Sequence, residues 1–201
     1  MNDSFYMQMA LDLAARGRGS TSPNPMVGAV IVKGDKIIAS GYHKKAGTAH
    51  AEAAALKKAG TRANGATLYV TLEPCCHTHK RTPPCTKAVI AAGIKEVVAA
   101  MKDPNPEVSG RGLKELSKAG IKTRTGIMKE SARKLNEVFI KYITQKKPYV
   151  VLKIAQSIDG KIATSAGESK WITGAESRER VHKARNEVDA LLVGIGTVTA
   201  D

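Results

Sequence analysis

The sequence predicts an α/β protein in which helices cover both faces of a central sheet. Between residues 26 and 125, apolar segments with the length and composition of strands alternate with segments of helical periodicity. This alternation is typical of layered α/β folds. Aromatic residues make up only 4% of the chain, so Ala, Val, Ile and Leu have to form the core, as they do where sheets pack against helices.

The chain begins with a predicted helix at residues 3–17, because Asp3 can cap it and its apolar residues recur at helical spacing. Turn-forming residues at 20–25 predict a loop. Two apolar segments, 26–32 and 36–42, lie on either side of a Lys-Gly-Asp turn. They predict a β-hairpin.

Helices and strands then alternate, with glycine and proline at their boundaries. Glycine ends an Ala-rich helix, and a Pro-Pro sequence precedes the next one. A longer helix with an apolar stripe closes the domain. In chain order, these elements are a helix at 50–60, a strand at 66–73, a helix at 85–92, a strand at 94–100, a helix at 113–119, a strand at 121–125 and a helix at 131–144.

A second domain is expected after the basic, proline-containing sequence QKKPY, which places the boundary between domains 1–145 and 146–201. Apolar segments at 149–157 and 189–197 predict strands, with a polar helix at 175–186 between them. One helix and two strands bury too little surface to form a core. We therefore expect this second domain to be incomplete.

The net charge of +14 is compatible with a nucleic-acid partner, because Lys and Arg neutralise phosphates. The basic residues are scattered, however, with neither an arginine-rich tail nor a basic stripe interleaved with aromatic residues. We interpret the charge as solvated helix faces that also attract small phosphorylated substrates, and we expect no nucleic-acid partner.

No segment approaches the roughly 18 consecutive apolar residues needed to span a membrane, and the amino-terminal residues lack the layout of a secretion signal. We therefore expect a cytoplasmic protein with no membrane partner. Thiols stay reduced in the cytoplasm. All three cysteines lie within one short segment, residues 71–85, which favours metal binding or catalysis over a disulfide framework.

His50, Cys75 and Cys85 are the predicted metal ligands. His50 begins one expected helix, Cys75 follows a strand and Cys85 opens the next helix. A helix amino terminus lowers the pKa of a cysteine and so favours the thiolate that a zinc ion needs. Two thiolates and one imidazole leave a fourth tetrahedral position for water, which is the pattern of a catalytic zinc site.

Glu52, two residues after the histidine, is the predicted proton shuttle between water and a leaving amine. This division of roles is that of the zinc deaminases, whose pattern is H-x-E followed by P-C-x-x-C. Here nine residues instead of two separate Cys75 from Cys85. Cys76 is too near Cys75 to be the second ligand, and the histidines of the same segment are interpreted as exposed loop residues.

Two other functions compete with a small-molecule deaminase. A base deaminase acting on nucleic acid would use the same chemistry and would lose affinity steeply as salt rises. A non-enzymatic module with a structural zinc would retain its function after Glu52→Gln. A structural zinc, however, normally has four protein ligands.

Several motifs resemble the bifunctional deaminase/reductase family of riboflavin biosynthesis: TSPNPMVGAVIV, the HAE triplet, TLEPCCHTHKRTPPC, DPNPEVSGRG, KIAQSIDGKIATSAGESKWIT and VGIGTVTAD. The resemblance implies a cytidine-deaminase-like three-layer αβα domain followed by the truncated start of a dihydrofolate-reductase-like domain. It also implies zinc-dependent deamination of 2,5-diamino-6-(5-phosphoribosylamino)pyrimidin-4-one and NADPH-dependent reduction of the ribosyl arm by a complete second domain. The implied partners are this small phosphorylated pyrimidine and further copies of the chain in a homo-oligomer.

The resemblance also implies contacts beyond the metal site, although one inserted residue leaves open whether Lys80 or Arg81 is the basic contact. Arg185 has an independent argument, because a guanidinium matches a pair of phosphate oxygens, but a solvated helix charge explains it as well. The implied contacts are Asn24, His43, His77, Lys80, Asp103 and Asn105 for the deaminase substrate, Ser169 and Arg185 for the reductase substrate, and Ala155, Trp171, Thr197 and Asp201 for the cofactor.

Overall fold

The computed structural model describes residues 3–77 and 83–200. The chain divides into two compact units, Met1–Tyr149 and Val150–Asp201. None of the described helices is long and apolar enough to cross a membrane.

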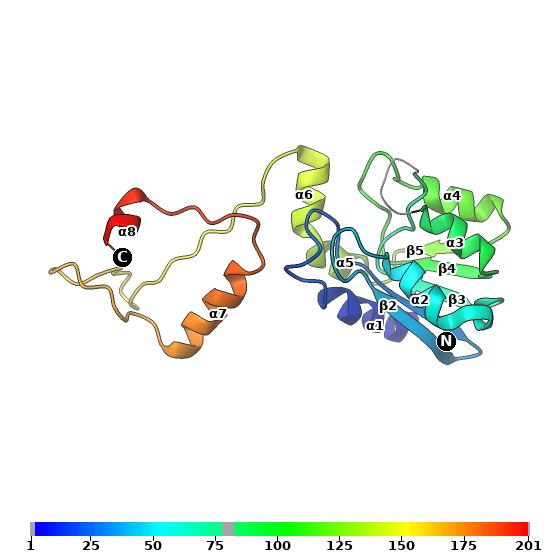
Figure 1. The fold of residues 1–201 in the computed structure, drawn as a ribbon, viewed down its shortest axis with the longest axis horizontal. Helices are drawn as coiled ribbons and strands as arrows, with labels where there is room; N and C mark the ends of the chain where they lie inside the picture. The colour runs from blue at the N-terminus through cyan, green and yellow to red at the C-terminus, as the bar shows by residue number, and fades with distance from the viewer. Residues whose placement is uncertain (1–2, 78–82, 201) are drawn as a thin grey trace. The chain divides into compact units, whose positions relative to one another are not determined.

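The first unit is built on a five-stranded mixed sheet in the order β2-β1-β3-β4-β5 (Figure 1). β1 pairs antiparallel with β2 and with β3, whereas β3, β4 and β5 run parallel. Parallel neighbours end at the same edge of a sheet, so the loops after β3 and β4 leave it side by side. The strands are β1 Gly28–Lys33, β2 Lys36–Tyr42, β3 Thr67–Val70, β4 Glu96–Ala99 and β5 Lys122–Thr125.

Helices cover both faces of this sheet, which confirms the predicted three-layer αβα architecture (Figure 1). One layer contains α1 and α5, and the other contains α2, α3 and α4. Aliphatic side chains of the strands and of the facing helices form one continuous core. The helices are α1 Asp3–Ala15, α2 Ala51–Ala59 followed by the 3-10 turn Gly60–Ala63, α3 Cys85–Ala91, α4 Arg111–Lys118 and α5 Lys129–Leu135.

The close approach of α2 to the sheet depends on Gly41 in β2. A Cβ atom at this position would lie 2.7 Å from the backbone nitrogen of Ala55 and 2.8 Å from the carbonyl oxygen of Ala51. Only glycine lets the backbones of helix and strand come this close. The start of α2 is thereby held against the sheet, and two of the predicted site residues lie there, His50 as the N-cap residue and Glu52 in the first turn.

The single helix predicted at 131–144 is wrong, because two helices, α5 and α6 (Glu137–Gln145), meet at Asn136. Asn136 has φ −110° and ψ 23° and is buried. Its Oδ1 accepts a hydrogen bond from the backbone N–H of Met26 at 2.8 Å, and its Nδ2 donates to the carbonyl oxygen of Met26 at 2.9 Å. These two hydrogen bonds hold Met26, which is distant in the sequence. Asn136 has a non-helical backbone conformation, so the helix is interrupted there.

The second unit contains the helices α7 Ala175–Arg185, which confirms the predicted polar helix, and α8 Ile195–Ala200. The prediction of strands at 149–157 and 189–197 is wrong, because neither segment forms a β-strand. Their apolar side chains are exposed: Leu152 is 82% accessible and Leu192 is fully accessible. No residue from 150 to 199 is buried. An apolar segment becomes a strand only beside other strands, and none is present among the described residues of this unit.

Candidate active site

Three predicted ligands converge at the edge of the sheet where β3 ends. The Nδ1 atom of His50 lies 3.5 Å from the Sγ atom of Cys75 and 3.4 Å from the Sγ atom of Cys85. All three donor atoms lie within 4.8 Å of one another. Both cysteines are buried, and His50 is half-buried.

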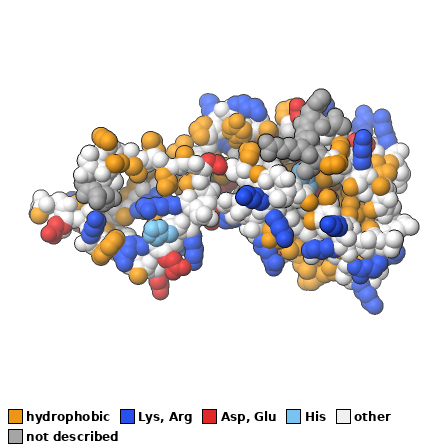
Figure 2. Space-filling model, in the orientation of Figure 1, with side chains coloured by type: hydrophobic (Ala, Val, Ile, Leu, Met, Phe, Trp, Pro, Cys, Tyr) orange, Lys and Arg blue, Asp and Glu red, His pale blue; other side chains and the backbone are white. Residues whose placement is uncertain are grey.

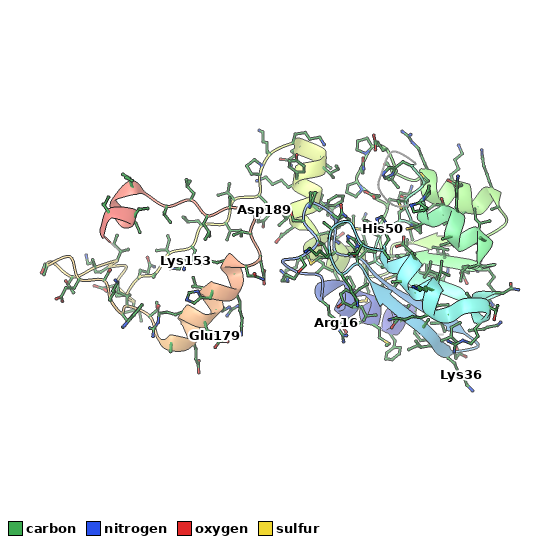
Figure 3. The ribbon with its side chains drawn as sticks, viewed as in Figure 1. Arg16, Lys36, His50, Lys153, Glu179 and Asp189 are labelled. Carbon is green, nitrogen blue, oxygen red and sulfur yellow. The ribbon has the colours of Figure 1, made fainter. Side chains whose placement is uncertain are left out.

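Each ligand is placed by a different local feature of the fold. His50 is the N-cap residue of α2 (Figure 3), with an extended backbone. Cys75 lies in the loop after β3, and Cys85 is the first residue of α3. The backbone N–H of Cys85 donates to the Sγ atom of Cys75 at 3.4 Å. This contact joins the two segments and stabilises negative charge on the Cys75 sulfur.

The donor set fits a zinc ion. Zinc lies about 2.3 Å from a thiolate sulfur and about 2.0–2.1 Å from an imidazole nitrogen, so tetrahedral coordination separates N and S by about 3.6 Å. The two observed N···S separations, 3.5 and 3.4 Å, match this value. Three protein donors leave one tetrahedral position for a small ligand.

The carboxyl group of Glu52 lies beside the same cluster, in the first turn of α2. The side chain is only 3% accessible. Burial, and after it the charge of Cys75, raise the pKa of Glu52 to about 7, although hydrogen bonds and the charge of His50 act in the opposite direction. A carboxyl group with a pKa near neutrality can both accept and donate a proton at physiological pH.

His43 is buried against the imidazole of His50, with the ring centroids 5.3 Å apart. Its Nδ1 lies 3.1 Å from the carbonyl oxygen of Ala49, which can only accept a hydrogen bond, so Nδ1 carries the proton. Its Nε2 therefore accepts from the Nδ2 of Asn24 at 3.1 Å. Burial lowers the pKa of His43, which favours this neutral form. The structure thus brings Asn24 and His43 together and uses both ring nitrogens within the chain.

The other residues implied for the deaminase substrate lie in the loops after β3 and β4. His77 is half-buried, and its Nδ1 is the one buried side-chain nitrogen or oxygen without a hydrogen-bond partner among residues 3–77 and 83–200. Asp103 is buried, and its Oδ1 accepts from the backbone N–H of Asn105 at 2.8 Å. Lys80 and Arg81 lie outside the described residues.

The residues implied for reductase chemistry are exposed or half-buried. Trp171 is 72% accessible, and the guanidinium carbon of Arg178 lies 4.3 Å from the centre of its ring. Ala155 is half-buried, whereas Ser169, Arg185 and Thr197 are exposed. Asp201 lies outside the described residues. None of the five that are described is part of a buried site.

Glu73 and Asn136 are two buried polar residues that sequence reasoning missed. Glu73 accepts three hydrogen bonds from backbone N–H groups of the segment 103–113. The only sequence signal for Glu73 is a charged residue at the end of an apolar strand segment. For Asn136 the signal is a poor helix former in the middle of an apolar stripe.

The positive charge of the chain is dispersed on the face drawn in Figure 2, where Lys and Arg side chains are scattered among apolar and polar ones. The charged side chains of the edge strand β5 pair locally. Arg124 contacts Asp3 at 2.6 Å and Glu96 at 2.7 Å, and Lys122 contacts Glu96 at 3.5 Å. The interpretation of the remaining charge as solvated helix faces that attract small phosphorylated substrates stays a prediction.

Comparisons with known proteins agree with the fold and with the site. Residues 1–101 match the family described as the cytidine and deoxycytidylate deaminase zinc-binding region, and residues 148–201 match the RibD C-terminal domain. The riboflavin biosynthesis protein RibD of Aquifex aeolicus is 57% identical over 199 residues, which are 99% of this chain and 56% of that protein.

Two solved structures are similar over nearly the whole chain. RibD of Acinetobacter baumannii superimposes with a TM-score of 0.94 at 52% identity, covering 99% of this chain and 56% of that one. A diaminohydroxyphosphoribosylaminopyrimidine deaminase/5-amino-6-(5-phosphoribosylamino)uracil reductase of Thermotoga maritima gives a TM-score of 0.93 at 48% identity, covering 99% and 57%. The chain thus spans about half the length of the relatives that it matches. It belongs to the cytidine and deoxycytidylate deaminase family and, within that family, to the RibD proteins of riboflavin biosynthesis.

Proposed function

We propose that the first domain, residues 1–145, is a zinc-dependent deaminase that hydrolyses the ring amine of 2,5-diamino-6-(5-phosphoribosylamino)pyrimidin-4-one. The observation that carries the proposal is the cluster of His50, Cys75 and Cys85 with the buried carboxyl group of Glu52 beside it. A relative that matches 99% of this chain is named for riboflavin biosynthesis, and the Thermotoga maritima protein is named for this deamination.

A zinc ion held by the imidazole and the two thiolates would lower the pKa of a bound water to about 7 and so supply a hydroxide nucleophile. Glu52 takes the proton that water gives up. It then delivers a proton to the amine nitrogen, so that ammonia leaves and a carbonyl replaces the C–NH2 group. The low accessibility of Glu52 keeps this proton from exchanging with bulk solvent.

The substrate contacts are proposed on the same basis. Asn24 gives its Nδ2 to His43, so its Oδ1 is the group that can accept an N–H of the pyrimidine. The unpartnered Nδ1 of His77 can bind a polar group of the substrate, and Asp103 and Asn105 lie in the loop after β4. Lys80 is the proposed basic contact of the substrate, with Arg81 as the alternative, and both lie outside the described residues.

For the second domain, residues 146–201, we propose the opening part of an NADPH-dependent reductase. The match to the RibD C-terminal domain and the printed name of the Thermotoga maritima protein support this. Within it, Ser169 and Arg185 are proposed for the substrate. The residues proposed for the cofactor are Ala155, Trp171, Thr197 and Asp201. A homo-oligomer and a cytoplasmic location stay predictions.

The test is ammonia release by the purified chain from the phosphoribosylated diaminopyrimidinone, with and without a chelator. We expect release only with zinc bound. Glu52→Gln should retain one zinc per chain and lose about 10²–10⁴-fold in rate, which is the usual contribution of a positioned proton shuttle. The matched control is Glu130→Gln, because the Glu130 side chain is 85% accessible. This variant should be fully active. Release by the chelated protein, or by Glu52→Gln at the normal rate, would contradict the proposal.

A further inference from the structure

Glu73 is a buried carboxylate whose oxygens are held by backbone N–H groups. The side chain is 3% accessible. Its Oε2 accepts from the N–H of Asp103 at 3.1 Å and from that of Gly110 at 2.8 Å. Its Oε1 accepts from the N–H of Leu113 at 3.1 Å. Three donors fill most of the acceptor capacity of one carboxylate.

These three bonds close one loop and cap one helix. The connection from β4 to α4, coloured green in Figure 1, comprises residues 100–110, and Asp103 and Gly110 are the first and last residues of its segment 103–110. One oxygen of Glu73 therefore ties both ends of this segment together. Gly110 is the N-cap residue of α4, and Leu113 lies in its first turn, where backbone N–H groups have no partner within the helix. Glu73 supplies the acceptors that the helix itself lacks.

The start of α4 packs tightly against the segment that carries Glu73. A Cβ atom on Gly112 would lie 2.1 Å from the carbonyl oxygen of Pro74 and 3.2 Å from the Oε1 of Glu73. The N–H of Glu73 donates to the carbonyl oxygen of Met101 at 3.0 Å. Glu73 therefore joins the segment after β3 to the segment after β4 through its main chain and through its side chain.

The two segments that Glu73 joins carry different parts of the proposed site. Cys75, a predicted zinc ligand, follows Glu73 by two residues. Asp103 and Asn105, proposed for the substrate, lie in the closed loop. Within this loop, Oδ1 of Asp103 accepts from the N–H of Asn105, and Oδ1 of Asn105 accepts from the N–H of Glu107 at 3.0 Å. The loop thus has internal turns, and Glu73 fixes these turns relative to the metal ligands.

We propose that Glu73 is a positioning residue that sets the substrate-binding loop 103–110 in register with the zinc ligands. The inference rests on the proposed deaminase function, because the role of the loop in binding does. Glu73 does not touch the substrate. Its removal should therefore weaken substrate binding and leave the zinc and the proton shuttle in place.

The test compares Glu73→Gln with Glu115→Gln in the full chain. Gln has the same shape as Glu, but its NH2 group has to face at least one backbone N–H donor, which breaks that bond. Glu115 is a half-buried carboxylate of α4 that accepts from the hydroxyl of Thr86, a residue outside the loop, at 3.0 Å. Zinc content, KM, kcat and amide hydrogen exchange are measured for both variants.

For Glu73→Gln we expect full zinc content, a KM raised about tenfold and a kcat changed less than about threefold, which is the signature of lost binding without lost chemistry. Exchange at the amides of Asp103, Gly110 and Leu113 should accelerate. Glu115→Gln should change neither KM nor these amides. If Glu73→Gln does not fold, Glu73→Asp keeps the charge, falls one methylene short of the loop and should raise KM in the same way.

A folded, zinc-loaded Glu73 variant with an unchanged KM would overturn the proposal, and so would unchanged exchange at the three amides. Failure of the proposed function is a separate outcome. In that case the unsubstituted chain releases no ammonia, while the exchange measurement still reports whether Glu73 holds the loop.

Discussion

Asn136→Ala is expected to destabilise the first unit strongly, because one side chain holds both backbone groups of Met26. Oδ1 accepts from the Met26 N–H at 2.8 Å, and Nδ2 donates to its carbonyl oxygen at 2.9 Å. Leaving a buried backbone group unpaired costs about 1–3 kcal/mol. Asn136 is only 3% accessible, but Met26 is half-buried. Water can therefore offset part of this cost, and we expect a loss of about 2–4 kcal/mol for the two groups together.

The loss is measured by urea unfolding followed by far-ultraviolet circular dichroism. Tryptophan fluorescence would not report it, because Trp171, the only tryptophan, lies in the second unit. With a slope of about 2 kcal/mol per molar urea, the midpoint should fall by roughly 1–2 M. Ser131→Ala, an exposed substitution in α5, is the control and should change stability by less than about 0.5 kcal/mol. A loss below about 1 kcal/mol for Asn136→Ala, with an unchanged slope, would refute the claim that these contacts hold the two segments together.

Two further predictions concern the packing of α1 and α2. Hydrogen bonds from the Arg124 guanidinium lower the pKa of Asp3. The ionised carboxylate therefore stabilises the fold fully at a pH above its unfolded pKa of about 3.9. This stabilisation is lost as the pH falls through the lower pKa of the folded state. Asp3→Asn should therefore cost about 1 kcal/mol at pH 7, a modest amount because the Arg124 side chain is 38% exposed and the pair is screened by salt. The difference between Asp3→Asn and the unsubstituted chain should vanish near pH 2 in thermal unfolding, and a difference independent of pH would contradict the assignment. Gly41→Ala should cost about 1–3 kcal/mol and also lower zinc affinity, because the new Cβ atom pushes α2, and His50 at its N-cap, away from the sheet. Isothermal titration calorimetry with zinc would detect the lower affinity. An affinity equal to that of the unsubstituted chain would show that zinc binding does not require α2 to lie this close to the sheet.

Apart from the single helix expected at 131–144, the elements of the first unit could be predicted because their signals are local. Capping residues, glycines, prolines and hydrophobic periodicity lie within a few residues of the boundaries that they set. The helix at 85–92 and the hairpin at 26–42 are observed close to the expected positions. In the second unit, the strands expected at 149–157 and 189–197 failed, because an apolar segment forms a strand only when neighbouring strands cover it. Hydrophobic periodicity indicates which secondary structure a segment can adopt when it is packed. It does not indicate whether the strands that it would pair with are present.

The proposed metal ligands could be recognised in the sequence, whereas the contacts of Glu73 and Asn136 could not. Zinc accepts few residue types, and those types are scarce enough in this chain for His50, Cys75 and Cys85 to stand out, even with an atypical spacing. The partners of Glu73 and Asn136 are backbone N–H and C=O groups, which every residue except proline offers alike. Only the folded chain determines which of these groups come within reach, 30–40 residues away for Glu73 and 110 residues away for Asn136. The side chains proposed for the chemistry can therefore be identified in the sequence. The main-chain contacts that position them cannot, because they depend on the folded structure.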